Sequence, residues 1–244
     1  MALTRLLVVE HEADAGLGRL APVLRQAARL DVHRPYLGDR LPDGLSGHQG
    51  LIVLGGAMSA WDDEVAPWLP ATRGLLAGAV GAGLPTLGIC LGAQLLAVAT
   101  GGRVERGDRG LEVGLVPVTA LPAATDDALL GTAAGDDESI PVEVAQYHQD
   151  AITELPPDAT LLATGERYPH QAFRVGKSGW GVQYHPEVTA ADFAAWLRDG
   201  HGAVRAAGLD AAEIARRYAA AEPGLAAVAR AHAGAFAALL GRST

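Results

Sequence analysis

PTLGICLGAQLL, residues 85–96, joins a short apolar run to an uncharged run of helical composition through a corner that holds Cys90. The first run predicts a buried strand and the second a helix, so the chain turns from strand to helix within about one residue. Gly88 and Gly92, two positions before and after the cysteine, remove the side chains that would clash at such a bend. The pattern G-x-C-x-G therefore predicts a nucleophile elbow, which exposes the corner side chain at the top of a parallel sheet.

The segments before this corner alternate between strand and helix patterns. We expect strands at 3–10, 31–37 and 50–56 and helices at 14–30 and 64–81, with a further helix at 91–100. This alternation predicts an α/β fold with a doubly wound, mostly parallel sheet, whose sites lie at the carboxyl ends of the strands.

The pattern changes after residue 102. Short strand candidates follow at 112–120, 142–148, 159–165, 170–176 and 179–185, and they predict a mixed extension of the sheet. An alanine-rich helical tail is expected over about 189–244, divided at Glu222-Pro223-Gly224. Its apolar positions predict a buried set of Ile214, Tyr218, Val228, Phe236 and Leu240. No repeat or linker interrupts the chain, so we predict one domain over 1–244.

Composition narrows the class of partner. The 244 residues carry a formal net charge of −9, whereas nucleic acids and anionic membranes require a basic surface, so neither is expected as a partner. The uncharged stretch 74–102 is long enough to span a bilayer, but glycines and a proline interrupt it, and a buried strand and helix explain it better. A single cysteine and the absence of a signal-peptide pattern lead us to expect a cytoplasmic protein without a thiolate zinc site.

The corner offers Cys90 several activating groups. The N-terminus of the following helix favours a thiolate, and the backbone N–H of Leu91 is free to point at a developing oxyanion. The amide of Gln94 lies about one helical turn further on and faces the same side. A lone cysteine is more often buried and inert, so the bend alone does not establish a nucleophile.

A base for this nucleophile is expected in GVQYHPE, residues 181–187. Residues i and i+2 of an extended segment face the same side, so His185 and Glu187 can lie together, and Pro186 keeps the segment extended. A carboxylate beside an imidazole fixes its tautomer and stabilises the imidazolium. Taken alone, such a pair is more often a solvated strand end.

Together these motifs resemble the class I glutamine amidotransferases, which use a Cys–His–Glu triad. GICLGAQLLA matches the nucleophile motif of that family and GVQYHPEV its His-Pro-Glu motif. LIVLGGAMS, residues 51–59, resembles the oxyanion strand, with Ala57 in place of the usual proline. The likeness extends over about 50–190 and implies a flavodoxin-like class I glutaminase fold. It implies no metal and no organic cofactor.

The resemblance also implies roles for individual residues. Cys90 would be the nucleophile, His185 the general acid and base, and Glu187 the group that orients His185. Gly55 and Gly56 would supply the second oxyanion donor and allow glutamine to approach the backbone.

Further residues are candidates for binding glutamine. QYHQD, residues 146–150, falls where this family grips the α-amino and α-carboxylate groups of glutamine, so His148, Gln149 and Asp150 are candidate substrate-binding residues. A polar strand end is an equally good interpretation of this segment. Glu112, in a Glu-Val-Gly element of some stand-alone members, is expected to be structural.

The implied function is hydrolysis of the glutamine side-chain amide through a γ-glutamyl thioester, in a stand-alone domain resembling the amidotransferase part of GMP synthase. Ammonia would pass to an unidentified acceptor or to a synthase subunit, and the alternative is a free-standing hydrolase of γ-glutamyl amides or peptides. Loops 57–63 and 147–150 would line the mouth of the site. Trp61 would contact a synthase there or pack on the helix expected at 64–81.

Two alternative hypotheses assign the protein to other functional classes. A dinucleotide-binding module is suggested by GLGRLA, residues 16–21, but Glu10, Glu12 and Asp14 would crowd the pyrophosphate. A non-catalytic relative is disfavoured by the complete set of triad residues.

Overall fold

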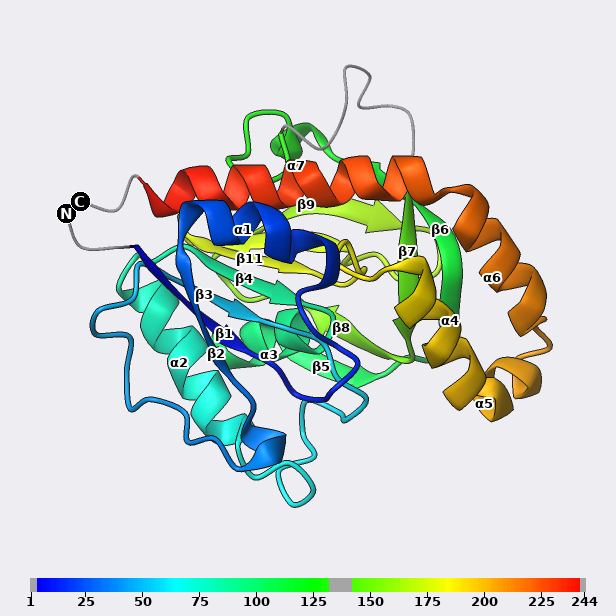
Figure 1. The fold of residues 1–244 in the computed structure, drawn as a ribbon, viewed down its shortest axis with the longest axis horizontal. Helices are drawn as coiled ribbons and strands as arrows, with labels where there is room; N and C mark the ends of the chain where they lie inside the picture. The colour runs from blue at the N-terminus through cyan, green and yellow to red at the C-terminus, as the bar shows by residue number, and fades with distance from the viewer. Residues whose placement is uncertain (1–3, 132–141, 242–244) are drawn as a thin grey trace.

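The computed structural model describes residues 4–131 and 142–241. Within these residues a nine-stranded sheet runs in the order β2-β1-β3-β4-β11-β10-β9-β6-β7 (Figure 1). The first five of these strands pair in parallel, and the remaining four continue the sheet with antiparallel pairings. The predicted fold class, a doubly wound and mostly parallel sheet with a mixed extension, is confirmed.

The parallel half of the sheet contains its three fully buried strands. Its strands are β1 (Arg5–Val9), β2 (Arg29–His33), β3 (Gly50–Val53), β4 (Thr86–Ile89) and β11 (Gly179–Val182). All residues of β3, β4 and β11 are buried, as expected for parallel strands that are covered on both faces. The antiparallel half consists of β6 (Glu112–Ala120), β7 (Val142–His148), β9 (Ala159–Gly165) and β10 (Ala172–Val175).

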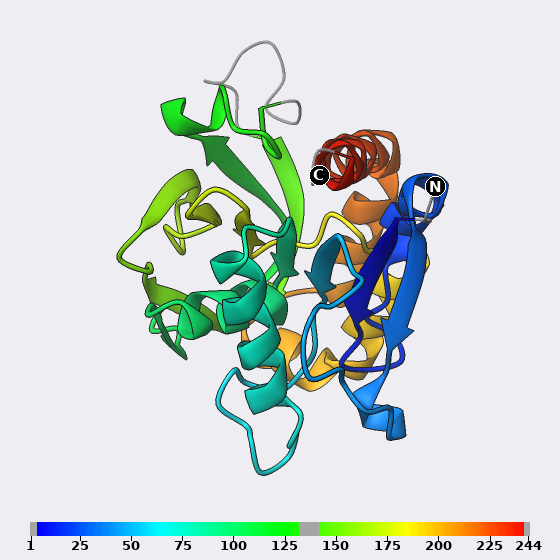
Figure 2. The same cartoon turned by 90° about the vertical axis from the view of Figure 1, so that its left-hand side faces the viewer.

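Helices cover both faces of this sheet. Alternate residues of β1 enter different core clusters, Leu6 and Val8 on one face and Leu7 and Val9 on the other. The first face packs under α1 (Ala21–Ala27) and α7 (Glu222–Leu240), which lie side by side, and the second packs under α2 (Leu69–Gly81) and α3 (Leu91–Ala99) (Figures 1 and 2). The carboxyl ends of β3, β4 and β11 therefore open at one edge between the two layers.

The helical tail has four helices: α4 (Ala190–Asp199), α5 (His201–Ala206), α6 (Ala211–Ala220) and α7. The predicted division at residues 222–224 is found, with Pro223 in the first turn of α7. Tyr218, Phe236 and Leu240 are buried as expected, whereas Ile214 and Val228 are only half-buried.

Helix α7 is the one described helix whose length and composition alone would allow it to cross a membrane. Its buried residues, Leu225, Ala229, Ala233, Phe236 and Leu240, face the rest of the protein, and the last four belong to the core that also contains α1. One face of this helix therefore packs into the core, and 33% of its most apolar stretch is buried.

Several predicted boundaries were wrong. The helix expected at 14–30 begins only at Ala21, because Gly18 has φ +43° and lies outside the right-handed helical region. The helix expected from residue 64 begins at Leu69, after turns. Strand β11 ends at Val182, so residues 183–185 are not part of the sheet.

A two-stranded antiparallel sheet was not predicted. It pairs β5 (Arg103–Arg106) with β8 (Asp150–Glu154). Only Val104 of β5 is buried, so this segment lacks the hydrophobic pattern by which strands are found in a sequence.

Candidate active site

Cys90 occupies a nucleophile elbow between β4 and α3. It has φ +50° and ψ −108°, and it is the only non-glycine among the described residues with a positive φ. A methyl group at Gly88 would lie 2.3 Å from the carbonyl oxygen of Gly92, and one at Gly92 would lie 2.0 Å from that of Val53. The two glycines thus permit a turn so tight that the backbone on either side of the cysteine comes into contact.

His185 and Glu187 form a buried pair beyond the end of β11. Nδ1 of His185 lies 2.7 Å from Oε1 of Glu187, and the two residues are 4% and 2% exposed. The pairing was predicted from strand alternation, but the segment 183–189 is neither strand nor helix. A bend, and not an extended strand, brings the two side chains together.

The charges around His185 favour its protonated form. Burial acts to lower the pKa of His185, but the negative charges of Glu187 and Cys90, with hydrogen bonds to both, outweigh it and raise this pKa to about 10. The ring therefore holds a proton across the neutral range, next to the sulfur and ready for transfer to a leaving group.

The raised pKa of His185 predicts where activity falls at high pH. Below about pH 10 the imidazolium is present as an acid, and above it the proton is lost. We expect the alkaline limb of kcat/KM to lie near that pH. An alkaline limb near 6.5, the ordinary value for histidine, would contradict the paired geometry.

Gly55 and Gly56 lie directly against the elbow. A methyl group at Gly55 would be 3.1 Å from Cε1 of His185 and 3.7 Å from Cβ of Cys90. One at Gly56 would be 2.6 Å from Sδ of Met58 and 3.0 Å from a side-chain methyl of Leu91. The glycine pair therefore lies in close contact with Cys90 and with Leu91 at the start of α3, where the resemblance predicts the oxyanion hole.

Replacing Gly56 is expected to impair turnover through the backbone. In Gly56→Val the new side chain meets Met58 and Leu91 and displaces the loop, and the loss of one oxyanion donor lowers kcat by roughly 10²–10³-fold. Steady-state kinetics on protein with an unchanged unfolding midpoint measures this effect. A normally folded Gly56→Val with wild-type turnover would remove this loop from the oxyanion hole.

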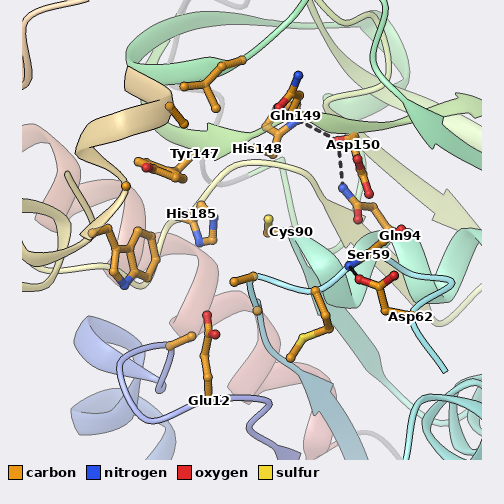
Figure 3. Close-up of a pocket in the computed structure, with 18 of the residues that line it drawn as sticks. Glu12, Ser59, Asp62, Cys90, Gln94, Tyr147, His148, Gln149, Asp150 and His185 are labelled. Atoms are coloured by element: carbon orange, nitrogen blue, oxygen red, sulfur yellow. Dashed lines mark hydrogen bonds between the residues drawn. The ribbon is translucent and has the colours of Figure 1, made fainter. Parts of the chain in front are cut away.

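Cys90 opens onto a cavity of about 860 Å³ at the carboxyl edge of the sheet (Figure 3). His185 and Tyr147 lie on one side of the sulfur in this view, and Gln94, Gln149 and Asp150 lie on the other. The Nε2 amide of Gln94 donates to the backbone oxygen of Asp150 at 3.0 Å, which ties the first turn of α3 to β8.

His148 lines the cavity, is 6% exposed and is bonded through both ring nitrogens. Nδ1 lies 2.9 Å from the backbone oxygen of Asp150, and Nε2 lies 3.0 Å from Oε2 of Glu112. The same Oε2 accepts from Gln171, which in turn accepts from Gln146. Glu112 therefore has a structural role, because it is hydrogen-bonded to His148, which in turn is hydrogen-bonded to the backbone of Asp150.

Gln149 and Asp150 present their side chains near the mouth of the cavity. Arg106 of β5 donates to Oε1 of Gln149 and lies 3.1 Å from Oδ1 of Asp150. Arg106 is 68% exposed in its side chain and Asp150 only 15%, so the cation covers the carboxylate from the solvent side.

Arg106 and Trp196 are among the cavity residues that were not predicted from the sequence. Trp196 of α4 lies edge-on to His185, with ring centroids 4.8 Å apart, and its Nε1 donates to the backbone oxygen of Asp14 at 3.2 Å. Arg106 lies on the unpredicted strand β5, and Trp196 lies on α4, shortly after Glu187, but no local signal connects either side chain with the site.

Trp61 lines the cavity and also contacts α2, whereas its contact with a synthase stays a prediction. It is 53% exposed at the cavity mouth, its Nε1 donates to the backbone oxygen of Val104 at 2.9 Å, and the guanidinium of Arg73 in α2 lies 5.8 Å from its ring centroid. One edge is thus fixed to the protein and the rest faces solvent.

The glycines that suggested a dinucleotide site serve a different contact. A methyl group at Gly18 would lie 2.1 Å from the backbone oxygen of Glu187, and one at Gly16 would lie 3.5 Å from the carboxylate of Glu10. Gly18 thus allows the N-terminal loop to pack onto the segment that carries His185 and Glu187.

Known proteins are similar to this chain in sequence. Residues 29–201 match the sequence model of the family described as Glutamine amidotransferase class-I. A GMP synthase [glutamine-hydrolyzing] of Porphyromonas gingivalis is 40% identical over 179 residues, 72% of this chain and 32% of that synthase, so the chain spans about a third of the synthase's length. Gamma-glutamyl peptidase 5 of Arabidopsis thaliana is 32% identical over 159 residues, 64% of this chain and 61% of the peptidase.

A solved structure resembles this chain in fold. The crystal structure of a glutamine amidotransferase from Thermotoga maritima aligns with a TM-score of 0.83 at 26% identity, covering 97% of this chain and 99% of that one. The family expected from the motifs is therefore confirmed: the chain belongs to the class I glutamine amidotransferases.

Proposed function

We propose that the protein hydrolyses the side-chain amide of L-glutamine through a covalent thioester on Cys90. The observation that carries this proposal is the arrangement of Cys90 at the elbow, His185 beside it and Glu187 2.7 Å from the imidazole, all facing one cavity or buried directly behind it. No metal and no organic cofactor takes part in the proposed reaction.

In the first half of the reaction, Sγ of Cys90 attacks the amide carbon of glutamine, and the carbonyl electron pair moves onto oxygen. The N–H groups of Leu91 and Gly56 stabilise this oxyanion. His185 gives the proton that it took from the thiol to the amide nitrogen, the C–N bond breaks, and ammonia leaves.

In the second half, water attacks the thioester carbon while His185 accepts its proton. The C–S bond then breaks, glutamate leaves, and His185 returns the proton to Sγ. Glu187 holds the imidazole by accepting from Nδ1 throughout. The sum is glutamine and water converted to glutamate and ammonia.

We assign the α-amino and α-carboxylate groups of glutamine to the side of the cavity formed by Gln94, Gln149 and Asp150. Asp150 suits an ammonium group, and Arg106 suits a carboxylate because its guanidinium already pairs with one. His148 also lines the cavity, but both its nitrogens are engaged with Asp150 and Glu112, so it positions the backbone of Asp150.

A second candidate function is hydrolysis of γ-glutamyl amides or peptides without an ammonia acceptor. The likeness to a gamma-glutamyl peptidase supports it, as does a cavity whose volume of about 860 Å³ would admit a leaving group larger than ammonia. The chemistry at Cys90 is the same for both candidates, and only the leaving amine differs.

Glutamate release from glutamine and from a panel of γ-glutamyl amides and dipeptides separates the two candidates. Each substrate is compared at matched concentration, with Cys90→Ala as the blank. A kcat/KM highest for glutamine supports the amidotransferase, and one highest for a substituted amide supports the hydrolase. Release at the blank rate for the whole panel would refute both.

We further propose that a synthase subunit docks at the cavity mouth and that the 244 residues act as one cytoplasmic domain. Trp61 is half-exposed at that mouth, and exposed tryptophan favours interfaces. The aligned GMP synthase is about three times longer than the part that matches this chain, which is consistent with a further partner.

Docking at Trp61 predicts a partner-dependent activity. We expect slow glutaminase activity from the purified protein and faster turnover in the presence of a copurifying partner, with Trp61→Ala losing most of the increase but not the basal rate. Assays with and without cell extract measure it. Fast hydrolysis by the purified protein that neither extract nor Trp61→Ala alters would favour the free-standing hydrolase.

A further inference from the structure

The segment that carries His185 and Glu187 has little support of its own. Residues 183–189, here called the triad segment, lie between β11 and α4 and belong to neither. Within the described residues Oε2 of Glu187 is buried without a hydrogen-bond partner. The orientation of Glu187 therefore depends on how firmly its backbone is held.

Three of the four tail helices contact this short segment. Trp196 of α4 packs on His185, with ring centroids 4.8 Å apart. The hydroxyl of Tyr218 in α6 donates to the backbone oxygen of Val188 at 2.8 Å. His232 of α7 accepts from the hydroxyl of Tyr184, 2.8 Å away, because its other nitrogen donates to Val228.

Arg19, which precedes α1, also connects the tail to the segment. Its backbone N–H donates to the oxygen of Glu187 at 2.8 Å, and its Nε donates to the oxygen of Val188 at 2.7 Å. The two terminal nitrogens of the guanidinium bind the carboxylate of Glu222 at the start of α7. The carbonyl of Val188 is thus gripped twice, by Arg19 and by Tyr218.

We propose that the C-terminal helices form a brace that positions His185 and Glu187 for catalysis, with Tyr218 and Arg19 as its positioning residues. The family match ends at residue 201, so α6 and α7 lie outside the part shared with that family model. The consequences for turnover rest on the function proposed above, whereas the contacts themselves do not.

The brace acts at a place where small displacements are costly. The pair of His185 and Glu187 is buried and joined by one hydrogen bond of 2.7 Å, and a displacement of about 1 Å at a catalytic group can cost on the order of 10²-fold in rate. His185 also faces Cys90 and, across the cavity, the carboxylate of Glu12. A loosened Glu187 would leave these two groups to set the charge on the ring.

Tyr218→Phe tests the proposal with little disturbance, because it removes one hydroxyl and keeps the ring that stacks on Phe193 at 4.4 Å. We expect kcat per titrated active site to fall about tenfold with KM for glutamine unchanged. The alkaline limb of kcat/KM should move to lower pH, since Glu187 is held less well against His185. Arg19→Lys, which keeps the charge but loses the guanidinium fork, should act in the same direction.

Tyr36→Phe is the matched control, because Tyr36 lies in the turn after β2, outside the cavity lining. It should leave kcat and the pH limb unchanged. If Tyr218→Phe and Arg19→Lys both keep the wild-type kcat and pH limb, the brace is refuted. A loss of folded protein with no change per active site would also refute it, because the helices would then be only structural.

A measurement without substrate separates the brace from the proposed reaction. Iodoacetamide alkylates a thiolate, and Cys90 is the only cysteine in the chain, so the pH profile of alkylation reports the Cys90–His185 pair alone. The profile of Tyr218→Phe should shift to higher pH, since a less stabilised imidazolium stabilises the thiolate less. If the wild-type protein hydrolysed no γ-glutamyl compound, the proposed function would fail, and this shift or its absence would still decide the brace.

Discussion

Cys90→Ala is expected to abolish glutamate release, lowering kcat by about 10⁴-fold or more, because no other group can form the thioester. Cys90 is the only cysteine in the chain, so no second thiol can replace it beside His185. The rate of glutamate formation under saturating glutamine measures the loss. The expected residual activity is that of a cavity that still binds substrate but cannot attack it.

Covalent labelling provides the complementary evidence for Cys90. A glutamine-like electrophile such as a chloroketone should add its mass at Cys90, and excess glutamine should slow the addition. Full activity in Cys90→Ala, or adducts only at other residues, would remove the assignment of this residue as nucleophile.

Glu187→Gln is expected to lower kcat by roughly 10³–10⁴-fold with little change in KM. The amide of glutamine would present a donor to Nδ1 of His185 and so disfavour the tautomer that the reaction needs. It would also remove the largest source of the raised His185 pKa, so the alkaline limb of kcat/KM should move to lower pH. Steady-state kinetics over a range of pH gives both quantities.

The control for Glu187 is Glu166→Gln, which makes the same chemical change at an exposed position. It should leave both constants unchanged. A Glu187→Gln protein with raised KM and normal kcat would identify Glu187 as a substrate-binding residue and contradict the triad.

The sequence predicted the elements whose periodicity is local. The bounds of β6, β7 and β9 coincide with the predicted ones, because alternating residues and turn signals mark both ends of each strand. Leu17, Leu20 and Leu24 are buried as their spacing indicates, yet the first of them is not helical. Gly18 has a positive φ at the point where its backbone packs closely against Glu187, and no local sequence pattern reveals that contact.

The residues of the candidate site were likewise predicted only where the signal is local in the sequence. The nucleophile elbow at Cys90 was predicted from two glycines at fixed spacing, because a tight turn requires residues without side chains at nearby positions. Arg106 was not predicted, because it reaches the cavity through the pairing of β5 with the distant β8. Trp196 follows the His-Pro-Glu motif closely in sequence, but its contact with His185 depends on how the chain turns between β11 and α4, which no local pattern reveals. The contact of Glu112 with His148 was not predicted either, because His148 lies on the neighbouring strand.

At position 90, the stability of the backbone and the chemistry of the side chain favour different residues. A side chain held at φ +50° costs on the order of 1–3 kcal/mol, a considerable part of the roughly 5–15 kcal/mol by which folded proteins exceed their unfolded states. Glycine at this position would relieve the strain and silence the chemistry in one step. In a lineage that kept the fold for docking and no longer needed the reaction, glycine is the replacement that selection for thermal stability would fix at position 90.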